Sequence, residues 1–168
     1  MTGSVTTSIK RWCLIALLVA GTVGCDRLTK HIAAQRLAGL PTQSYLADTL
    51  RLGYAENVGG FLSLGAGLPA PVRTIIFTSA TGILLVLLIA AAWRKGWDRW
   101  RTVALALFIA GGASNWIDRF ATGKVVDFLN VGIGSVRTGV FNVADVAIMA
   151  GVALLLVAEL TTSRTLGA

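Results

Sequence analysis

Three aspartates in the second half of the chain lie at positions that are unusual for a solvated carboxylate. Asp127 stands inside the apolar tetrapeptide 125–128, whose neighbours should desolvate its carboxyl group and raise its pKa. Asp118 closes one apolar block, and Asp145 lies near the beginning of another. Two carboxyl groups held close together cannot both ionise easily, so such a pair keeps one proton and offers both an acid and a base. The residue types therefore indicate acid–base chemistry, and they do not by themselves select Asp127 over Asp118.

Two of the polar segments also have purely structural interpretations. Asn142 at a helix N-cap and Asp145 three residues later suit a helix start and its dipole. Asp26 and Lys30 are four residues apart, so they share one helical face and can form an ion pair at a helix end. The functional alternative for Asp26 and Lys30 is contact with a lipid head group or a substrate. The residue types leave both alternatives open.

The run 111–119, Gly-Gly-Ala-Ser-Asn-Trp-Ile-Asp-Arg, combines small and polar residues at the end of an apolar block. Small residues allow helices to approach closely in lipid. Asn115 could hydrogen-bond to a neighbouring helix, and Asp118 could pair with Arg119 or Arg27. Packing accounts for the glycines, but it does not account for the polar groups that follow them directly.

Apolar blocks must position these polar groups. Of the 168 residues, 55% are apolar and 14% are charged, whereas a typical soluble domain has about 25% charged residues. The mean hydropathy is +0.73. A helix needs roughly 20 apolar residues to cross a hydrocarbon core of about 30 Å. We therefore expect an all-α polytopic membrane protein with four transmembrane helices, in which residues 1–168 form a single integral membrane domain. The expected spans are approximately 12–30, 72–93, 101–118 and 142–160.

The segments between these spans predict two extracytoplasmic loops, approximately 38–71 and 119–141. Residues 50–54 alternate between apolar and other residues, a period of two that indicates a short strand. The following run 57–61, Asn-Val-Gly-Gly-Phe, predicts a turn, because Asn and Gly tolerate positive φ. We expect a small β-hairpin or sheet that lies on the outer membrane surface.

The distribution of charge predicts the orientation only in part. With a cytoplasmic N-terminus, seven Lys and Arg lie inside and eight outside, so their number does not decide the orientation. Four of the inner cations lie within 94–101, in a short turn between two spans, which favours N-in and C-in. Acids near hydrocarbon are costly and mark functional sites. Six acids fall on the outer side in this topology, which predicts a site there: Asp26, Asp48, Glu56, Asp118, Asp127 and Asp145.

The first span also has the outline of a cleaved secretory signal. Lys10 and Arg11 precede an apolar run that ends in small residues before Cys25, as in a lipoprotein cleavage box. Thr22 occupies the position that usually carries leucine in such boxes, and three later spans would remain after cleavage. We therefore expect the first span to be retained, and mass spectrometry of the mature N-terminus would test this.

Charge and composition argue against several other classes of protein and site. The formal net charge is +7, but the cations flank apolar spans and do not form a basic stripe on a soluble face, so no nucleic-acid partner is expected. Cys13 and Cys25 are about 18 Å apart on a helix, too far for a disulfide within it. With two cysteines on one span and a single histidine, His31, no metal site and no cofactor are predicted.

Taken in order, five segments resemble lipoprotein signal peptidase, the signal peptidase II family. They read Asp-x-x-Thr-Lys from 26, Asn-x-Gly-x-Phe from 57, Gly-Gly-x-x-Asn-x-x-Asp-Arg from 111, Val-Val-Asp-Phe from 125 and Phe-Asn-x-Ala-Asp from 141. The resemblance covers roughly residues 12–160. The last three motifs are specific, and the first two are short.

The resemblance implies an aspartyl endopeptidase with Asp127 and Asp145 as its catalytic pair. Similar enzymes act at the extracytoplasmic side of the bacterial cytoplasmic membrane and remove signal peptides from prolipoproteins. They cut before a cysteine that already carries diacylglycerol, need no metal, and are inhibited by globomycin. The expected partners are therefore the prolipoprotein substrate, membrane lipids and a globomycin-type inhibitor, and we expect a monomer. Positions that match supporting residues of the family site are Asp26, Lys30, Asn57, Asn115, Asp118, Arg119 and Asn142.

This sequence departs from the family pattern at two positions. Ser114 replaces a glycine, which predicts a looser helix approach, and the loop that begins at Asn57 is one residue shorter than usual. Within the pair, the helix N-terminus should make Asp145 the readier anion, which leaves Asp127 as the readier acid. This assignment is a hypothesis.

Three other functions remain as alternatives. A Ser–Lys peptidase would use Lys30 or Lys124 as its base, and it would be inhibited by serine-directed reagents but not by globomycin. A small transporter or proton relay would also carry intramembrane acids, but nearer the middle of the bilayer. A non-catalytic relative that binds lipidated peptides would not need a complete aspartate pair.

Overall fold

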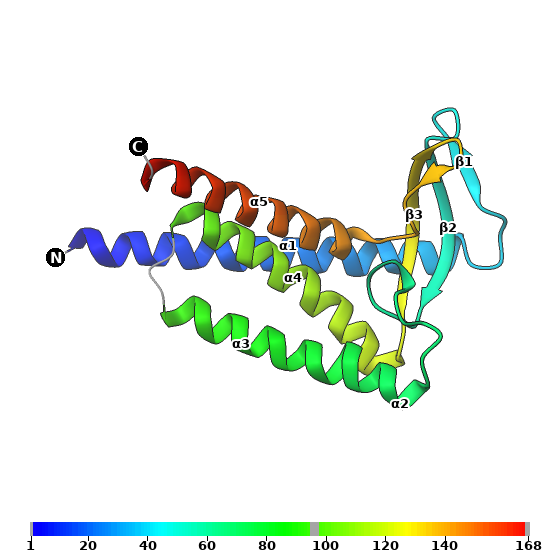
Figure 1. Ribbon diagram of the computed structural model, residues 1–168, viewed down its shortest axis with the longest axis horizontal. Coiled ribbons are helices and arrows are strands. Elements are labelled where there is room, and N and C mark those ends of the chain that lie inside the picture. Colours follow the sequence, from blue (N-terminus) through cyan, green and yellow to red (C-terminus); the bar gives the residue numbers. More distant parts are fainter. Residues whose placement is uncertain (1, 95–97, 167–168) are drawn as a thin grey trace.

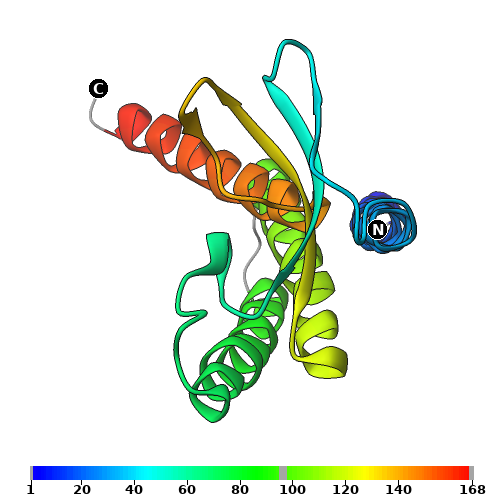
Figure 2. The same cartoon turned by 90° about the vertical axis from the view of Figure 1, so that its right-hand side faces the viewer.

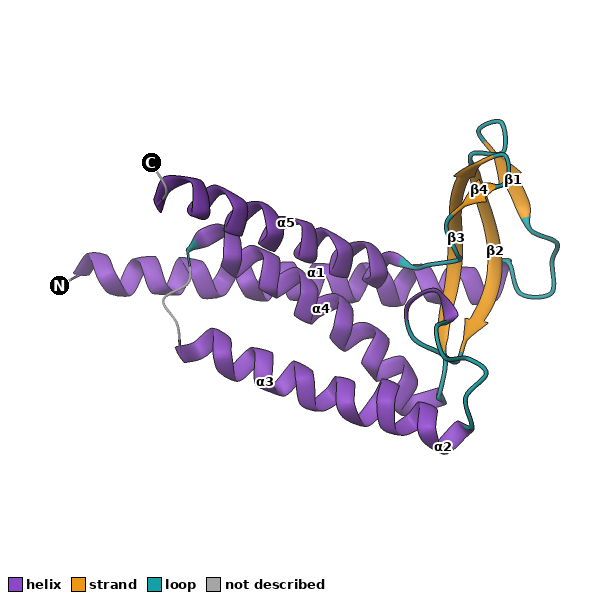
Figure 3. Cartoon of the chain, in the orientation of Figure 1, coloured by secondary structure: helices purple, strands orange, loops and turns teal. Residues whose placement is uncertain are grey.

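The computed structural model describes residues 2–94 and 98–166. Long helices run side by side, and a small antiparallel sheet stands across one end of them (Figure 1, Figure 3). The elements in chain order are α1 (Thr2–Arg36), β1 (Gln43–Tyr45), β2 (Leu50–Asn57), η1 (Phe61–Ser63), α2 (Ala70–Arg73), the π-helix η2 (Thr74–Ala80), α3 (Thr81–Arg94), α4 (Arg99–Thr122), β3 (Val125–Ile133), β4 (Val136–Arg137) and α5 (Val143–Leu166).

Among the described residues, three helical stretches are long and apolar enough to cross a membrane. They are Trp12–Arg36, Ala70–Ala92 and Val143–Thr161, and few of their side chains are buried within the protein. Outward-facing apolar helices are the arrangement expected when lipid is the solvent. The helix α4 has 24 residues, a comparable length. It is more polar than the other three, because its C-terminal half carries the Asn, Asp and Arg side chains of the run 111–119.

The helices extend beyond the expected spans. The first span was expected to end at residue 30, but α1 continues to Arg36, and α4 continues past residue 118 to Thr122. The expected first span already includes Asp26 and Lys30, and the expected third span ends at Asp118. The structure pairs several of those charges inside the protein, as for Lys30 with Asp26, so the helices need not stop there.

Local signals in the sequence set both ends of α4. Asp98 caps its first turn, because the carboxylate accepts hydrogen bonds from the backbone N–H groups of Trp100 and Arg101 at 2.8 and 3.1 Å. Gly123 ends the helix in the left-handed conformation, with φ of 74°. The chain then turns directly into β3.

The sheet has the order β1-β2-β3-β4, and all neighbours are antiparallel. The strand expected at residues 50–54 is confirmed, and it continues as far as Asn57. In the β2–β3 register, Asn57 pairs with Val125 and Ala55 pairs with Asp127. Because side chains alternate between the faces of a strand, Asn57 and Asp127 project to the same face.

Glycines bring α4 and α5 into close contact. A Cβ atom on Gly111 would overlap the carbonyl oxygen of Ala144, and one on Gly151 would lie 2.6 Å from the carbonyl oxygen of Ala104. Helices that meet in lipid commonly approach through such small residues. Viewed along the helices, α1 and α3 lie on opposite sides of the α4–α5 pair (Figure 2). The first turn of α5 is therefore held close to the C-terminal half of α4.

Candidate active site

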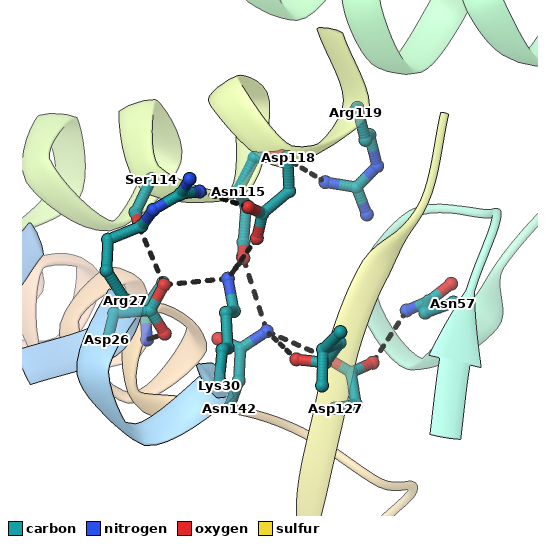
Figure 4. Close-up of polar contacts among 12 residues, drawn as sticks. Asp26, Arg27, Lys30, Asn57, Ser114, Asn115, Asp118, Arg119, Asp127 and Asn142 are labelled. Carbon is teal, nitrogen blue, oxygen red and sulfur yellow. Dashed lines mark hydrogen bonds and ion pairs between the residues drawn. The ribbon is translucent and has the colours of Figure 1, made fainter. Parts of the chain in front are cut away.

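Asp127 projects from β3 into a buried polar site between the sheet and the ends of the helices (Figure 4). Its side chain is 2% exposed. The Nδ2 atom of Asn142 donates to its Oδ1 at 2.7 Å, and Nδ2 of Asn57 donates to its Oδ2 at 3.0 Å. Burial raises the pKa of the Asp127 carboxyl group to about 6; the charge of Asp145 also raises it, and the two hydrogen bonds lower it. The apolar neighbours thus have the effect on Asp127 that the sequence predicted.

Asp145 is the third residue of α5 and takes part in a reciprocal cap with Asn142. The backbone N–H of Asp145 donates to Oδ1 of Asn142 at 2.9 Å, and the backbone N–H of Asn142 donates to Oδ2 of Asp145 at 3.1 Å. This is the geometry of a capping box. The helix-start interpretation of these two residues is therefore correct. It leaves Oδ1 of Asp145 to accept a hydrogen bond from Nδ2 of Asn115 at 2.9 Å.

Asn142 connects the two carboxyl groups. Its side-chain amide donates to Asp127, and its backbone N–H donates to Asp145. Asn142 is fully buried, so the positions of both carboxyl groups depend on one rigid residue. Each of the four carboxylate oxygens of Asp127 and Asp145 accepts a hydrogen bond from an asparagine. Such donors orient a carboxyl group in either protonation state.

Asp26 and Lys30 form a buried ion pair behind this site, with Nζ 2.7 Å from Oδ2 of Asp26. Asp26 is 0% exposed and Lys30 is 5% exposed. Oδ1 of Asp26 accepts the backbone N–H of Ala144 at 2.9 Å, so this carboxylate also caps the first turn of α5. Of the two interpretations of this pair, the burial supports the structural one and not direct contact with lipid head groups.

Asp118 pairs with Arg27 and Lys30, and its carboxylate lies 2.6 Å from Nζ of Lys30. The suggested pairing of Asp118 with Arg27 is therefore correct. Arg119, the other suggested partner, donates instead from Nε and Nη2 to the carbonyl oxygen of Gly59, at 3.1 and 2.6 Å. Successive residues on a helix project in directions about 100° apart, so Asp118 faces α1 while Arg119 faces the loop after β2.

Asn57 shapes that loop and also reaches Asp127. Its Oδ1 accepts the backbone N–H of Gly59 at 2.9 Å, and its Nδ2 donates to the carbonyl of Gly60 at 2.9 Å as well as to Asp127. The predicted turn is therefore present. The contact with Asp127 is formed although the loop is one residue shorter than in the usual family pattern.

Ser114 is a polar contact that the sequence did not predict. It is fully buried, and its hydroxyl donates to Oδ2 of Asp26 at 2.7 Å. This hydrogen bond connects α4 to α1, so the serine joins the two helices. The sequence offered only the departure from glycine as a signal, and that signal did not identify the partner.

The structure does not support either candidate base of a Ser–Lys peptidase. Nζ of Lys30 contacts Asp26, Asp118 and Asn115, which uses all three of its donors. Nζ of Lys124 lies 2.8 Å from the carboxylate of Glu56 in an exposed ion pair.

Replacing Arg119 with lysine should loosen the loop after β2. An ammonium group cannot reproduce the two hydrogen bonds that the planar guanidinium group donates to the carbonyl oxygen of Gly59. We expect roughly a 10-fold loss of kcat/KM, because a neutral–charged hydrogen bond of this kind contributes about 1.5–3 kcal/mol. Activity assays and limited proteolysis of 57–69 would measure both effects. An unchanged loop and unchanged activity would contradict this role of Arg119.

Comparison with known proteins agrees with this geometry. The family described as Signal peptidase (SPase) II matches residues 14–161 of the chain. The chain belongs to the signal peptidase II family. It is 33% identical to the lipoprotein signal peptidase of Syntrophus aciditrophicus, over 89% of this chain and 94% of that protein. It is 31% identical to that of Streptococcus pneumoniae, over 90% and 95%.

A solved structure shares the fold of the chain. A bacterial membrane enzyme determined by the in meso method at 2.3 Å resolution superposes with a TM-score of 0.80. Its sequence is 27% identical to this chain, and the match covers 90% of both chains. As a signal peptidase II, the chain is a membrane protease of the class that removes signal peptides from prolipoproteins.

Proposed function

We propose that the protein is an aspartyl endopeptidase in which Asp127 and Asp145 activate a water molecule between them. The observation that supports this most is that Asn142 holds both carboxyl groups, while burial keeps the pKa of Asp127 near 6. A pair in which one member is protonated and the other ionised can act as acid and base in turn. The buried polar groups converge at one end of the bundle, as a site at a membrane surface requires.

In the proposed reaction, Asp145 accepts a proton from the water as its oxygen attacks the carbonyl carbon of the scissile amide. Asp127 donates its proton to the leaving nitrogen, and the C–N bond breaks as the new C–O bond is completed. The signal peptide leaves with a new carboxylate, and the diacylglyceryl cysteine becomes the new amino terminus. The first turn of α5 favours the anionic form of the carboxylate that begins it.

We further propose a four-span topology in the bacterial inner membrane, with both termini cytoplasmic and the sheet on the extracytoplasmic side. Under this proposal α4 spans the membrane in addition to the three apolar stretches and is the third span in chain order, and its polar outer half faces the site and not the lipid. The expected loops 38–71 and 119–141 then correspond to the sheet and its connections. Cysteine accessibility on either side of inverted vesicles would test the orientation.

Cleavage of a diacylglyceryl prolipoprotein by the purified enzyme tests the function. We expect cleavage immediately before the lipidated cysteine, no requirement for added metal, and inhibition by globomycin. The same precursor without diacylglycerol should be cut far more slowly, because its acyl chains would no longer position it. Equal rates for the two precursors, or cleavage that persists with globomycin, would contradict the proposal.

The pH dependence of kcat/KM should reveal the raised pKa of Asp127. This residue must hold its proton to act as an acid, so activity should fall as pH rises through about 6 in the free enzyme. The Asn57 hydrogen bond lowers this pKa. Asn57→Ala should therefore move the alkaline limb to higher pH, in addition to lowering the maximal rate. Because the two carboxyl groups titrate as a pair, the apparent values belong to both. A limb that stays fixed or moves to lower pH would contradict the assignment of Asp127 as the acid.

A further inference from the structure

Three asparagines donate hydrogen bonds to the carboxyl groups of Asp127 and Asp145. The amide oxygen of each asparagine accepts a hydrogen bond from a group that can act only as a donor. For Asn57 that group is the backbone N–H of Gly59, and for Asn142 it is the backbone N–H of Asp145. An amide whose oxygen faces such a donor must direct its NH2 group elsewhere. Both of these amides therefore direct an N–H toward Asp127.

For Asn115, the main donor to the amide oxygen is a side chain and not a backbone N–H group. Nζ of Lys30 donates to Oδ1 of Asn115 at 2.8 Å, and Nδ2 of Asn142 approaches the same oxygen at 3.2 Å. Nδ2 of Asn115 then donates to Oδ1 of Asp145 at 2.9 Å. An ammonium group has three donors and no acceptor, so it allows only this orientation of the amide.

We propose that Lys30 is a positioning residue: through Asn115 it fixes which amide atom faces Asp145, and so presents Asp145 with an N–H donor. This inference rests on the proposed function, since it concerns how Asp145 remains the base of the pair. Lys30 is buried behind Asn115, so it acts without touching the substrate. Its two other contacts, to Asp26 and Asp118, hold the ammonium group in place.

Two substitutions at Asn115 test the orientation while Lys30 stays intact. In Asn115→Asp, Lys30 holds one oxygen, and the second oxygen faces the Asp145 carboxyl group, so the two groups repel each other or share a proton and Asp145 loses its N–H donor. In Asn115→Ala, the space is left to water, which can donate. We expect kcat to fall roughly 10- to 100-fold in Asn115→Ala, as for loss of a hydrogen bond to a charged group. It should fall at least about 10-fold further in Asn115→Asp, with KM within about twofold. If Asn115→Asp is as active as Asn115→Ala, or more active, the proposed orientation is wrong.

A coupling measurement tests Lys30 itself. Lys30→Met alone would leave the buried Asp26 without its cation and would remove one of the two cations that pair with Asp118, so it is combined with Asp118→Asn to keep the local charge balanced. In the Asp118→Asn background, Asn115→Ala should lower kcat at least about 10-fold. In the Lys30→Met/Asp118→Asn background the same change should cost less than about threefold, because the ammonium group no longer fixes the orientation of the amide. Equal losses in both backgrounds would overturn the proposal.

The outcomes separate this inference from the proposed function. If Asp145→Asn is inactive but Asn115→Ala lowers kcat equally in both backgrounds, only the proposed role of Lys30 is wrong. A fully active Asp145→Asn enzyme would remove the aspartyl mechanism itself. If Lys30→Met/Asp118→Asn does not fold in detergent, as judged by thermal unfolding, the comparison of kcat between Asn115→Asp and Asn115→Ala still tests the proposed orientation.

Discussion

Asp127→Asn is expected to lower kcat/KM by roughly 10⁴-fold in a protein that still folds, although one amide N–H now faces another donor. The asparagine has nearly the same shape as the aspartate, but it cannot donate a carboxyl proton to the leaving nitrogen. Losses of this size are typical when one member of a catalytic unit is removed. The rate should be measured as signal peptide release from a diacylglyceryl prolipoprotein in lipid nanodiscs, together with the thermal unfolding temperature.

Glu56→Gln provides the matched control for Asp127→Asn. Glu56 is an acid on β2, next in sequence to Asn57, but its side chain is 40% exposed and pairs with Lys124. An exposed ion pair contributes about 0–1 kcal/mol, so this variant should keep both its activity and its fold. If Asp127→Asn and Glu56→Gln lose similar activity, a specific role for Asp127 is excluded.

Gly111→Ala is expected to damage both stability and activity, because the added methyl group meets backbone and not a flexible side chain. Its Cβ would overlap the carbonyl oxygen of Ala144, the residue directly before Asp145. Overpacking of this kind costs about 1–3 kcal/mol. Separating α4 from α5 also moves Asn115 away from Asp145, and a misplacement of about 1 Å can cost on the order of 10²-fold in rate. Thermal unfolding and kcat would measure the two effects.

Gly21→Ala is the corresponding control in α1. No atom lies within 4 Å of a Cβ built on Gly21. The substitution should therefore be neutral or stabilise the helix by up to about 1 kcal/mol, since alanine favours helix more than glycine does. Equal destabilisation by Gly21→Ala and Gly111→Ala would mean that close contact between α4 and α5 does not determine the effect.

The sequence predicted the fold in outline because its strongest signals are local. Long apolar runs predicted the helices, and alternation over residues 50–54 predicted the strand now seen as β2. Helix ends were less predictable, since α1 continues to Arg36, beyond the expected end at residue 30, although that span already included Asp26 and Lys30. Their pairing inside the protein depends on other helices, which no local pattern describes.

The residues of the candidate site were predicted better than their contacts. The resemblance to a family selected Asp127 over Asp118, and the structure gives a physical distinction between them. Asp127 receives only neutral amide donors, whereas Asp118 is bound by the cations of Arg27 and Lys30. The two carboxyl groups therefore differ in the charge of the groups that hold them.

Partner selection within the buried cluster could not have been predicted from spacing. The Ser114–Asp26 contact spans 88 positions in sequence, and the Asp26–Ala144 contact spans 118. Both depend on how α1, α4 and α5 pack together. The i, i+4 pairing of Asp26 with Lys30 was predictable, but the further contacts of Lys30 were not.

The most direct test of the carboxylate pair is single-turnover cleavage of a diacylglyceryl prolipoprotein by folded Asp145→Asn enzyme in lipid nanodiscs. The proposed mechanism predicts no product above that formed in nanodiscs without enzyme, from a variant that still unfolds cooperatively on heating. Cleavage at a rate within about 10-fold of the original enzyme would contradict the mechanism.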